Sequence, residues 1–212
     1  MLKSPNLSAQ KIFGAGPVVP VLVVDDLHEA HEITSALEAG GVKVIEVTLR
    51  TPQALEILRA LCVSFPHLLI GAGTVTTPEQ YKQAEFAGAT FCISPGCSVE
   101  LLQAGNEGMI PLIPGVSSTS EAMLAKNLGY RFLKFFPAVA SGGTAMLSAL
   151  RGPFPELVFC PTGGISQSNA NQFLALPNVK CVGGSWLAPK DAVTEKNWGA
   201  ITELAIQSRE LS

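Results

Sequence analysis

The sequence predicts an α/β fold, a single (β/α)₈ barrel (TIM barrel), from its length, its composition and the repeating order of its segments. The 212 residues suit one domain, residues 1–212, which can bury about 70% of the surface of the unfolded chain. A composition of 47% hydrophobic and 15% charged residues excludes a disordered chain. A short run rich in Val, Ile and Leu is followed by a helical pattern throughout, and eight such units of about 26 residues fit a small barrel.

The expected strands are eight short apolar runs. Because the runs are apolar on both faces and alternate with helical segments, they predict a parallel sheet that is covered by helices. The runs are Val18–Val24, Val42–Leu49, Leu68–Thr74, Thr90–Ser94, Met109–Pro114, Arg131–Phe136, Leu157–Thr162 and Lys180–Ser185.

The segments between the runs show the helical spacing of Ala, Leu, Glu and Gln. Pro52 and Pro78 each follow a threonine, as is typical of helix starts, and Gly40 and Gly88 stand where helices end. Residues 6–14 predict a short extra N-terminal helix that closes the bottom of the barrel. The expected helices include Leu27–Ala39, Pro52–Val63, Pro78–Ala87 and Ser118–Leu128.

The structural alternative is a doubly wound open sheet, which usually has fewer strands and binds dinucleotides through a G-x-G-x-x-G motif. Here Gly71-Ala72-Gly73 is followed by Thr74 and lacks the third glycine, so this motif is not present. Because no linker, low-complexity tract or charge block divides the chain, the barrel is the better prediction.

Charge, apolar run length and cysteine content exclude several classes of partner. A net charge of −3 without a run of Lys or Arg predicts no binding to nucleic acid. The apolar stretch Pro17–Val24 is too short to cross a membrane, and Asp25 and Asp26 follow it instead of a signal-peptide cleavage site. Five scattered cysteines with no C-x-x-C pair predict reduced thiols in a cytoplasmic protein and no metal site.

The run Arg131–Phe136 carries the strongest functional signal. Alternation puts Phe132, Lys134 and Phe136 on one face, so the lysine stands in mid-strand among apolar neighbours. Lysines are almost never fully buried without a reason, although a structural ion pair or a side chain that reaches out to solvent is the alternative. Removal from water disfavours the ammonium form, and a neutral amine can form a Schiff base with a ketone. Lys134 is therefore the candidate nucleophile for carbon–carbon cleavage.

The run Val42–Leu49 supplies partners for this lysine. Alternation places Glu46 on the inward face and Arg50 beyond the strand end. A carboxylate near the lysine can move protons directly or through one water. Arg50 can hold a substrate carboxylate with two hydrogen bonds and supply a cation that favours the neutral amine. The alternative is that Glu46 and Lys134 form only an interior salt bridge.

Two glycine-rich turns predict an anion site. One follows the seventh run, with Thr162, Gly163 and Gly164, and the other ends the eighth run at Gly184 and Ser185. Glycines let backbone N–H groups approach an anion, and phosphate sites in barrels commonly form after strands seven and eight. A tight turn is the alternative for each glycine pair alone.

Two further motifs end the third and fourth runs, and we interpret Thr74 and Pro95 in them as walls of a pocket. With these motifs, in this order, the sequence resembles the family of 2-keto-3-deoxy-6-phosphogluconate (KDPG) and 4-hydroxy-2-oxoglutarate (KHG) aldolases over essentially its whole length. The most specific motif is K-F-F-P-A. The motifs are Glu46-Val47-Thr48-Leu49-Arg50, Gly71-Ala72-Gly73-Thr74, Ser94-Pro95-Gly96, Lys134-Phe135-Phe136-Pro137-Ala138, Pro161-Thr162-Gly163-Gly164 and Gly183-Gly184-Ser185.

The resemblance implies a trimeric class I aldolase without metal or other cofactor, which cleaves KDPG to pyruvate and glyceraldehyde 3-phosphate. It implies that Lys134 is the Schiff-base nucleophile and Glu46 the proton-transfer residue. The other roles it implies are carboxylate binding by Arg50 and Thr74, pocket walls from Pro95, Phe136 and Thr162, and phosphate binding by Gly163, Gly164, Gly184 and Ser185.

Two other functions stay open at this point. A phosphosugar isomerase or synthase on the same barrel would use acid and base carboxylates without a covalent lysine. A non-catalytic phosphosugar-binding barrel would need no interior amine. The preference between KDPG and 4-hydroxy-2-oxoglutarate is also open, with the glycine-rich turns favouring the phosphorylated substrate.

Overall fold

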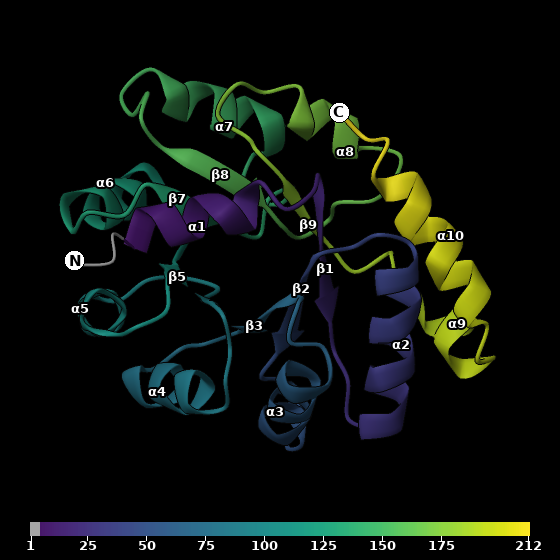
Figure 1. The fold of residues 1–212 in the computed structure, drawn as a ribbon. Helices are drawn as coiled ribbons and strands as arrows, with labels where there is room; N and C mark the ends of the chain where they lie inside the picture. Colours follow the sequence, from purple (N-terminus) through teal and green to yellow (C-terminus); the bar gives the residue numbers. More distant parts are fainter. Residues whose placement is uncertain (1–4) are drawn as a thin grey trace.

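The structure is a computed structural model that describes residues 5–212. Short parallel strands curl around the centre of the molecule, and helices lie around the outside (Figure 1). The strands are β1 (Val18–Leu22), β2 (Val44–Thr48), β3 (Leu69–Gly73), β4 (Cys92–Ile93), β5 (Leu112–Ile113), β6 (Gly115–Val116), β7 (Phe132–Phe135), β8 (Val158–Pro161) and β9 (Val182–Gly184). The helices are α1 (Pro5–Phe13), α2 (Leu27–Ala39), α3 (Ala54–Ser64), α4 (Pro78–Phe86), α5 (Val99–Glu107), α6 (Thr119–Asn127), α7 (Gly143–Arg151), α8 (Ala170–Leu174), α9 (Lys190–Thr194) and α10 (Trp198–Ser208).

The strands pair in parallel in two groups, in the orders β5-β4-β3-β2-β1-β9 and β6-β7-β8. The groups meet at two places. Strands β5 and β6 are separated only by Pro114, and β5 pairs with β4 while β6 pairs with β7. On the other side, Thr162 after β8 forms a parallel bridge with Gly183 of β9. The result is a curled parallel sheet.

Each predicted apolar run contains an observed strand, but the fifth run was placed wrongly at its end. The prediction stopped at Pro114, whereas Gly115–Val116 forms strand β6. Proline has no N–H to give to a ladder, so it marks a break in a strand. Here the chain resumes pairing directly after the proline, because Lys134 donates its N–H to the carbonyl of Pro114. The predicted helix Pro52–Val63 begins later, at Ala54.

Two apolar clusters account for the packing. The larger one lies between the strands and the outer helices and contains the outward residues of each strand, such as Ile45 and Val47 of β2. The smaller one lies inside the curled sheet, with Val44 and Ile113 among its members. Helix α1 adds Phe13 to the inner cluster, packs against β5 and β7, and so covers one end of the sheet.

Within residues 5–212, every helix is too short or too polar to cross a membrane. All five cysteines are free thiols, and three of them are buried.

Candidate active site

Strand β7 points Lys134 into the curled sheet. Its neighbours Leu133 and Phe135 are fully buried in the outer cluster, so alternation turns the lysine inward, as predicted. Only 5% of the Lys134 side chain is exposed, and its Nζ lies 5.3 Å from the centre of the Phe136 ring. The amine is therefore buried from solvent and lies over the face of an aromatic ring.

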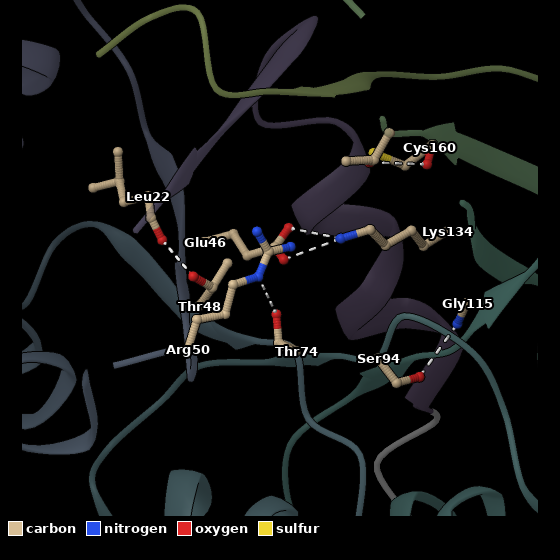
Figure 2. Close-up of polar contacts among 10 residues, drawn as sticks. Leu22, Glu46, Thr48, Arg50, Thr74, Ser94, Gly115, Lys134 and Cys160 are labelled. Atoms are coloured by element: carbon tan, nitrogen blue, oxygen red, sulfur yellow. Dashed lines mark hydrogen bonds and ion pairs between the residues drawn. The ribbon is translucent and has the colours of Figure 1, made fainter. Parts of the chain in front are cut away.

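Strand β2 brings Glu46 to this amine from a position 88 residues earlier in the chain. The Glu46 side chain is 2% exposed, and its Oε1 and Oε2 accept hydrogen bonds from Lys134 Nζ at 3.1 and 3.5 Å. Figure 2 shows the two side chains pointing toward one another across the interior. Such a pair is costly to desolvate and contributes little stability, so its chemistry is the better reason for its presence.

Arg50 and Thr74 meet at the rim. Arg50 is exposed just beyond β2, and its Nε donates to Thr74 Oγ1 at 3.2 Å (Figure 2). Thr74 has a φ of 58°, in the left-handed region that a β-branched residue rarely adopts. A residue held there costs about 1–3 kcal/mol, and such strain is typical of functional sites. The sequence pattern did not predict this conformation.

A cavity of about 290 Å³ opens at the same end of the sheet. It brings together six residues singled out from the sequence, including Phe136, which also contacts Lys134. The six are Arg50, Phe136, Thr162, Gly163, Gly164 and Ser185. The cavity is completed by Val21, Val23 and Ile165, which were given no role from the sequence, and by Gly183, which was named only as part of a motif.

The glycines of this cavity are required by geometry. Gly163 and Gly164 have φ values of 96° and 78°, and a Cβ on Gly164 would come within 2.8 Å of Val139. A Cβ on Gly183 would come within 2.9 Å of Thr162 Cγ2, so Gly183 gives the Thr162 side chain its space. The turns can therefore bring backbone groups close to an anion.

Gly184 and Pro95 were predicted to bind phosphate and to form a pocket wall, respectively. Neither belongs to the lining of the 290 Å³ cavity within the described chain. A Cβ on Gly184 would come within 2.6 Å of Trp186 Cη2, so this glycine packs against the tryptophan. Pro95 follows β4 and is partly exposed. A Cβ on Gly115 would lie 2.5 Å from the carbonyl oxygen of Pro95, so the two backbones pack closely here.

Ser94, next to Pro95, is fully buried, and its Oγ accepts a hydrogen bond from the Gly115 N–H at 3.2 Å (Figure 2). This bond ties the end of β4 to the start of β6. In the sequence, Ser94 stands out only as part of the motif Ser94-Pro95-Gly96.

A larger cavity of about 660 Å³ shares Val21, Val23 and Ser185 with the first one. Its lining includes Asp25 and Glu29 beside Lys190. Burial raises the pKa of the Glu29 carboxyl, and the charges of Asp25 and Asp26 raise it further. Because this rim is acidic, the smaller cavity with its glycine-rich turns is the better site for an anion.

Among the described residues, no group of three or more His, Cys, Asp or Glu side chains could hold a metal ion. A neutral amine can add to a carbonyl, and a carboxylate beside it can move the protons that the addition requires. The buried amine and carboxylate, on a curled parallel sheet with a cavity at the strand ends, are groups that a carbon–carbon lyase of the Schiff-base type would use.

Comparison with known proteins identifies the lyase family. The chain belongs to the KDPG and KHG aldolase family, which matches residues 9–204, and it is thus an aldolase. The 2-dehydro-3-deoxy-phosphogluconate aldolase of Pseudoalteromonas atlantica is 54% identical over 208 residues, covering 98% of this chain and 97% of that protein. The KHG/KDPG aldolase of Escherichia coli K12 is 49% identical over 209 residues, covering 99% and 98%.

The fold is also that of a solved member of the family. A crystal structure of KDPG aldolase from Legionella pneumophila, with pyruvate captured at low pH as a covalent carbinolamine intermediate, superposes with a TM-score of 0.94. It is 51% identical to this protein, and the match covers 95% of this chain and 98% of that one.

Proposed function

We propose that the protein is a class I aldolase that cleaves KDPG to pyruvate and glyceraldehyde 3-phosphate and also cleaves 4-hydroxy-2-oxoglutarate to pyruvate and glyoxylate. The observation that carries this proposal is that Nζ of the buried Lys134 lies 3.1 Å from Oε1 of the buried Glu46. The relatives named as KDPG and KHG/KDPG aldolases support the two substrates, and the carbinolamine in the Legionella enzyme supports the covalent route.

The reaction begins when Lys134 gives its ammonium proton to Glu46 and the neutral Nζ adds to C2 of the keto acid. Glu46 then protonates the carbinolamine oxygen, directly or through one water, and loss of water leaves an iminium ion. The C3–C4 bond breaks and its electron pair moves into the iminium, forming an enamine. The C4 hydroxyl gives its proton to the Glu46 carboxylate, directly or through one water, glyceraldehyde 3-phosphate departs, and Glu46 then supplies this proton to the enamine. Protonation of the enamine at C3 and hydrolysis of the imine release pyruvate and restore the amine.

The rim residues bind the two ends of the substrate in this proposal. Arg50 and Thr74 hold the keto-acid carboxylate, an arrangement supported by their hydrogen bond at the cavity edge. Pro95, Phe136 and Thr162 shape the pocket around the reacting carbons. The phosphate is bound by Gly163, Gly164, Gly184 and Ser185, and no metal or other cofactor takes part.

The architecture that we propose is one closed (β/α)₈ barrel spanning residues 1–212, with residues 6–14 as the extra N-terminal helix. Two connections between the strand groups support it: β5 pairs with β4 while β6, directly after it, pairs with β7, and Thr162 forms a parallel bridge with Gly183. We also propose a cytoplasmic homotrimer, as in the family that the sequence resembles.

The covalent step is tested by reducing the enzyme with borohydride in the presence of pyruvate and locating the adduct by mass spectrometry. The adduct is expected on Lys134, and Lys134→Ala should lose both the adduct and pyruvate release, by about 10⁴-fold or more. Pyruvate release is followed with a lactate dehydrogenase-coupled assay. A phosphosugar isomerase would give no adduct, and a binding barrel would release no pyruvate; either result would overturn the proposal.

Substrate preference is tested at Ser185, which lines the cavity between the two glycine-rich turns. Ser185→Leu should lower kcat/KM for KDPG much more than kcat/KM for 4-hydroxy-2-oxoglutarate, because only KDPG has a phosphate to displace. Equal losses for both substrates would contradict the assignment of the phosphate to this cavity.

A further inference from the structure

The sequence motif Gly71-Ala72-Gly73-Thr74 lacks the third glycine of a dinucleotide-binding motif, and its two glycines need another explanation. Both lie on β3, and the residues between and before them, Ile70 and Ala72, face the outer cluster. Gly71 and Gly73 therefore face inward, where the reactive pair lies. We propose that Gly73 is a positioning residue, whose missing side chain leaves the space in which the Glu46 carboxylate stands beside Lys134. This inference rests on the proposed function.

The fit between Gly73 and Glu46 is close. A Cβ built on Gly73 would lie 2.6 Å from Glu46 Cγ and 2.7 Å from Cδ, and nearer still to Oε1. Ordinary contact of a Cβ begins at 3.4 Å, so Cδ would have to retreat by about 0.7 Å and the oxygen by more. All three nearest atoms belong to Glu46, so an alanine at position 73 acts on the carboxylate before it acts on anything else.

The backbone of β3 is held too firmly to yield instead. Gly73 pairs with Thr48 in register, and the Leu49 N–H donates to the Gly73 carbonyl at 2.8 Å. On the other side, the Val75 N–H donates to the Ile93 carbonyl at 3.1 Å. The part that can move is the far end of the Glu46 side chain, and it can only move away from β3.

A retreat of this size matters because Lys134 Nζ is within hydrogen-bond distance of Glu46. The bond to Oε1 is 3.1 Å, close to the upper limit for N–H···O geometry, and the second contact is already 3.5 Å. A displacement of about 1 Å in a reacting group can cost about 10²-fold in rate. Gly73 thus affects the reaction through Glu46, without touching substrate.

Gly71 offers a matched control two residues earlier on the same face. A Cβ there would lie 2.5 Å from Phe91 Cζ, and all three nearest atoms belong to the Phe91 ring. Phe91 is part of the apolar inner cluster. Gly71→Ala therefore disturbs the same strand to a similar degree, but its effect does not pass through Glu46.

The test is a double-mutant cycle with Gly73→Ala, Glu46→Ala and the double variant, measured by pyruvate release from KDPG and by deuterium exchange into the methyl group of pyruvate. Gly73→Ala should lower kcat and the exchange rate by about 10²-fold, with a smaller change in KM. In the Glu46→Ala background, Gly73→Ala should change neither rate appreciably, because there is no carboxylate to displace. The effect of Gly71→Ala should be the same in both backgrounds.

Melting temperatures of the same variants give a readout that does not need activity. Gly73→Ala should lower Tm in the wild type and have little effect on Tm in Glu46→Ala, where the clash is gone. If Gly73→Ala does not fold, Gly73→Ala combined with Glu46→Asp should fold, because the shorter side chain withdraws from the new Cβ. Melting temperatures or rates that change equally in the two backgrounds would overturn the inference.

The proposed function can fail separately. Wild-type enzyme that exchanges the pyruvate methyl hydrogens but does not cleave KDPG would overturn the proposed substrate and leave the Gly73 test intact. If exchange and cleavage were both absent, the Schiff-base proposal would fail, and the cycle of melting temperatures would still decide whether Gly73 makes room for Glu46.

Discussion

The two ends of the curled sheet are built from the same strands and differ in the inward residue that each strand supplies. On β2, Val44 joins the inner apolar cluster, and the next inward residue is Glu46. On β7, Phe132 packs against that cluster, and the next inward residue is Lys134. One step of two residues along a strand, about 7 Å, separates an apolar layer from a reactive one.

The two ends of the sheet also differ in whether a helix covers them. At the amino end of the strands, α1 lays Phe13 on the inner cluster, and the Phe13 ring is 5.1 Å from that of Phe132. At the carboxyl end of the strands, Arg50 and Ser185 instead line an open cavity. Along the axis of this sheet, apolar packing lies at one end and the buried ion pair with its cavity at the other, as stability and chemistry are separated in parallel barrels in general.

Removal of the cover should test this separation most strongly. Phe13→Ala should lower the free energy of unfolding by about 3–5 kcal/mol, because a buried aromatic ring is lost from the inner cluster. The kcat of the folded variant should stay close to that of the wild type. Urea unfolding and steady-state kinetics at 25 °C measure the two quantities. A large loss of kcat with little loss of stability would show that the amino end takes part in the reaction.

Conversion of the reactive layer to an apolar one should test the comparison from the other side. The double variant Lys134→Met, Glu46→Leu should be inactive and more stable than the wild type by about 1–4 kcal/mol, since a buried ion pair is replaced by apolar packing. Lys134→Met alone should be less stable than the wild type, because it leaves the Glu46 carboxylate buried without its partner. If the double variant were much less stable than the wild type, the pair would be structural after all.

Alternation along the strands was enough to predict which ionisable side chains face inward. It placed Glu46 and Lys134 on inward faces, and the structure joins them at 3.1 Å although they are 88 residues apart. The glycine-rich turn at Gly163 and Gly164 was identified in a different way, from its place after the seventh apolar run. Chain order and period-two patterning carry this information because each strand of a parallel barrel enters at the same end.

Features that depend on neighbours in space could not be predicted in the same way. One such feature is the left-handed φ of Thr74, which depends on a turn that the pattern does not specify. Two others depend on a neighbouring side chain: Gly184 packs on Trp186, and Gly73 leaves space for Glu46. The cavity is lined by Gly183 rather than Gly184, a difference of one residue at the end of a short strand. Strand ends are the least regular part of a periodic pattern, and the site is built there.

The smallest predicted effect concerns how the reactive end responds to acid. Glu121, in the first turn of α6 and so at the carboxyl end of β6, accepts hydrogen bonds on Oε2 from the backbone and hydroxyl groups of both Ser117 and Ser118. Burial raises the pKa of the Glu121 carboxyl, but these four hydrogen bonds outweigh burial and hold the pKa below its ordinary value of 4.5. A lowered pKa in the folded state means that the charged carboxylate stabilises the fold above pH 4.5, and that this contribution is lost as the pH falls through the lowered value.

Glu121→Gln should therefore lower the free energy of unfolding by about 0.5–1 kcal/mol at pH 7, the size of a lost helix cap. The difference from the wild type should stay nearly constant from pH 7 to about pH 5 and shrink as the pH falls from about 4.5 through the lowered pKa, as measured by urea unfolding at several pH values down to about 3. Glu79→Gln, in the exposed first turn of α4, is the matched control and should cost less. If the difference in free energy of unfolding between Glu121→Gln and the wild type did not change with pH, the charge of the Glu121 carboxylate would not contribute to stability. The loss of free energy of unfolding in Phe13→Ala should not depend on pH in this way, because the Phe13 ring carries no ionisable group. The two ends of the sheet would then differ in their response to acid as well as in their chemistry.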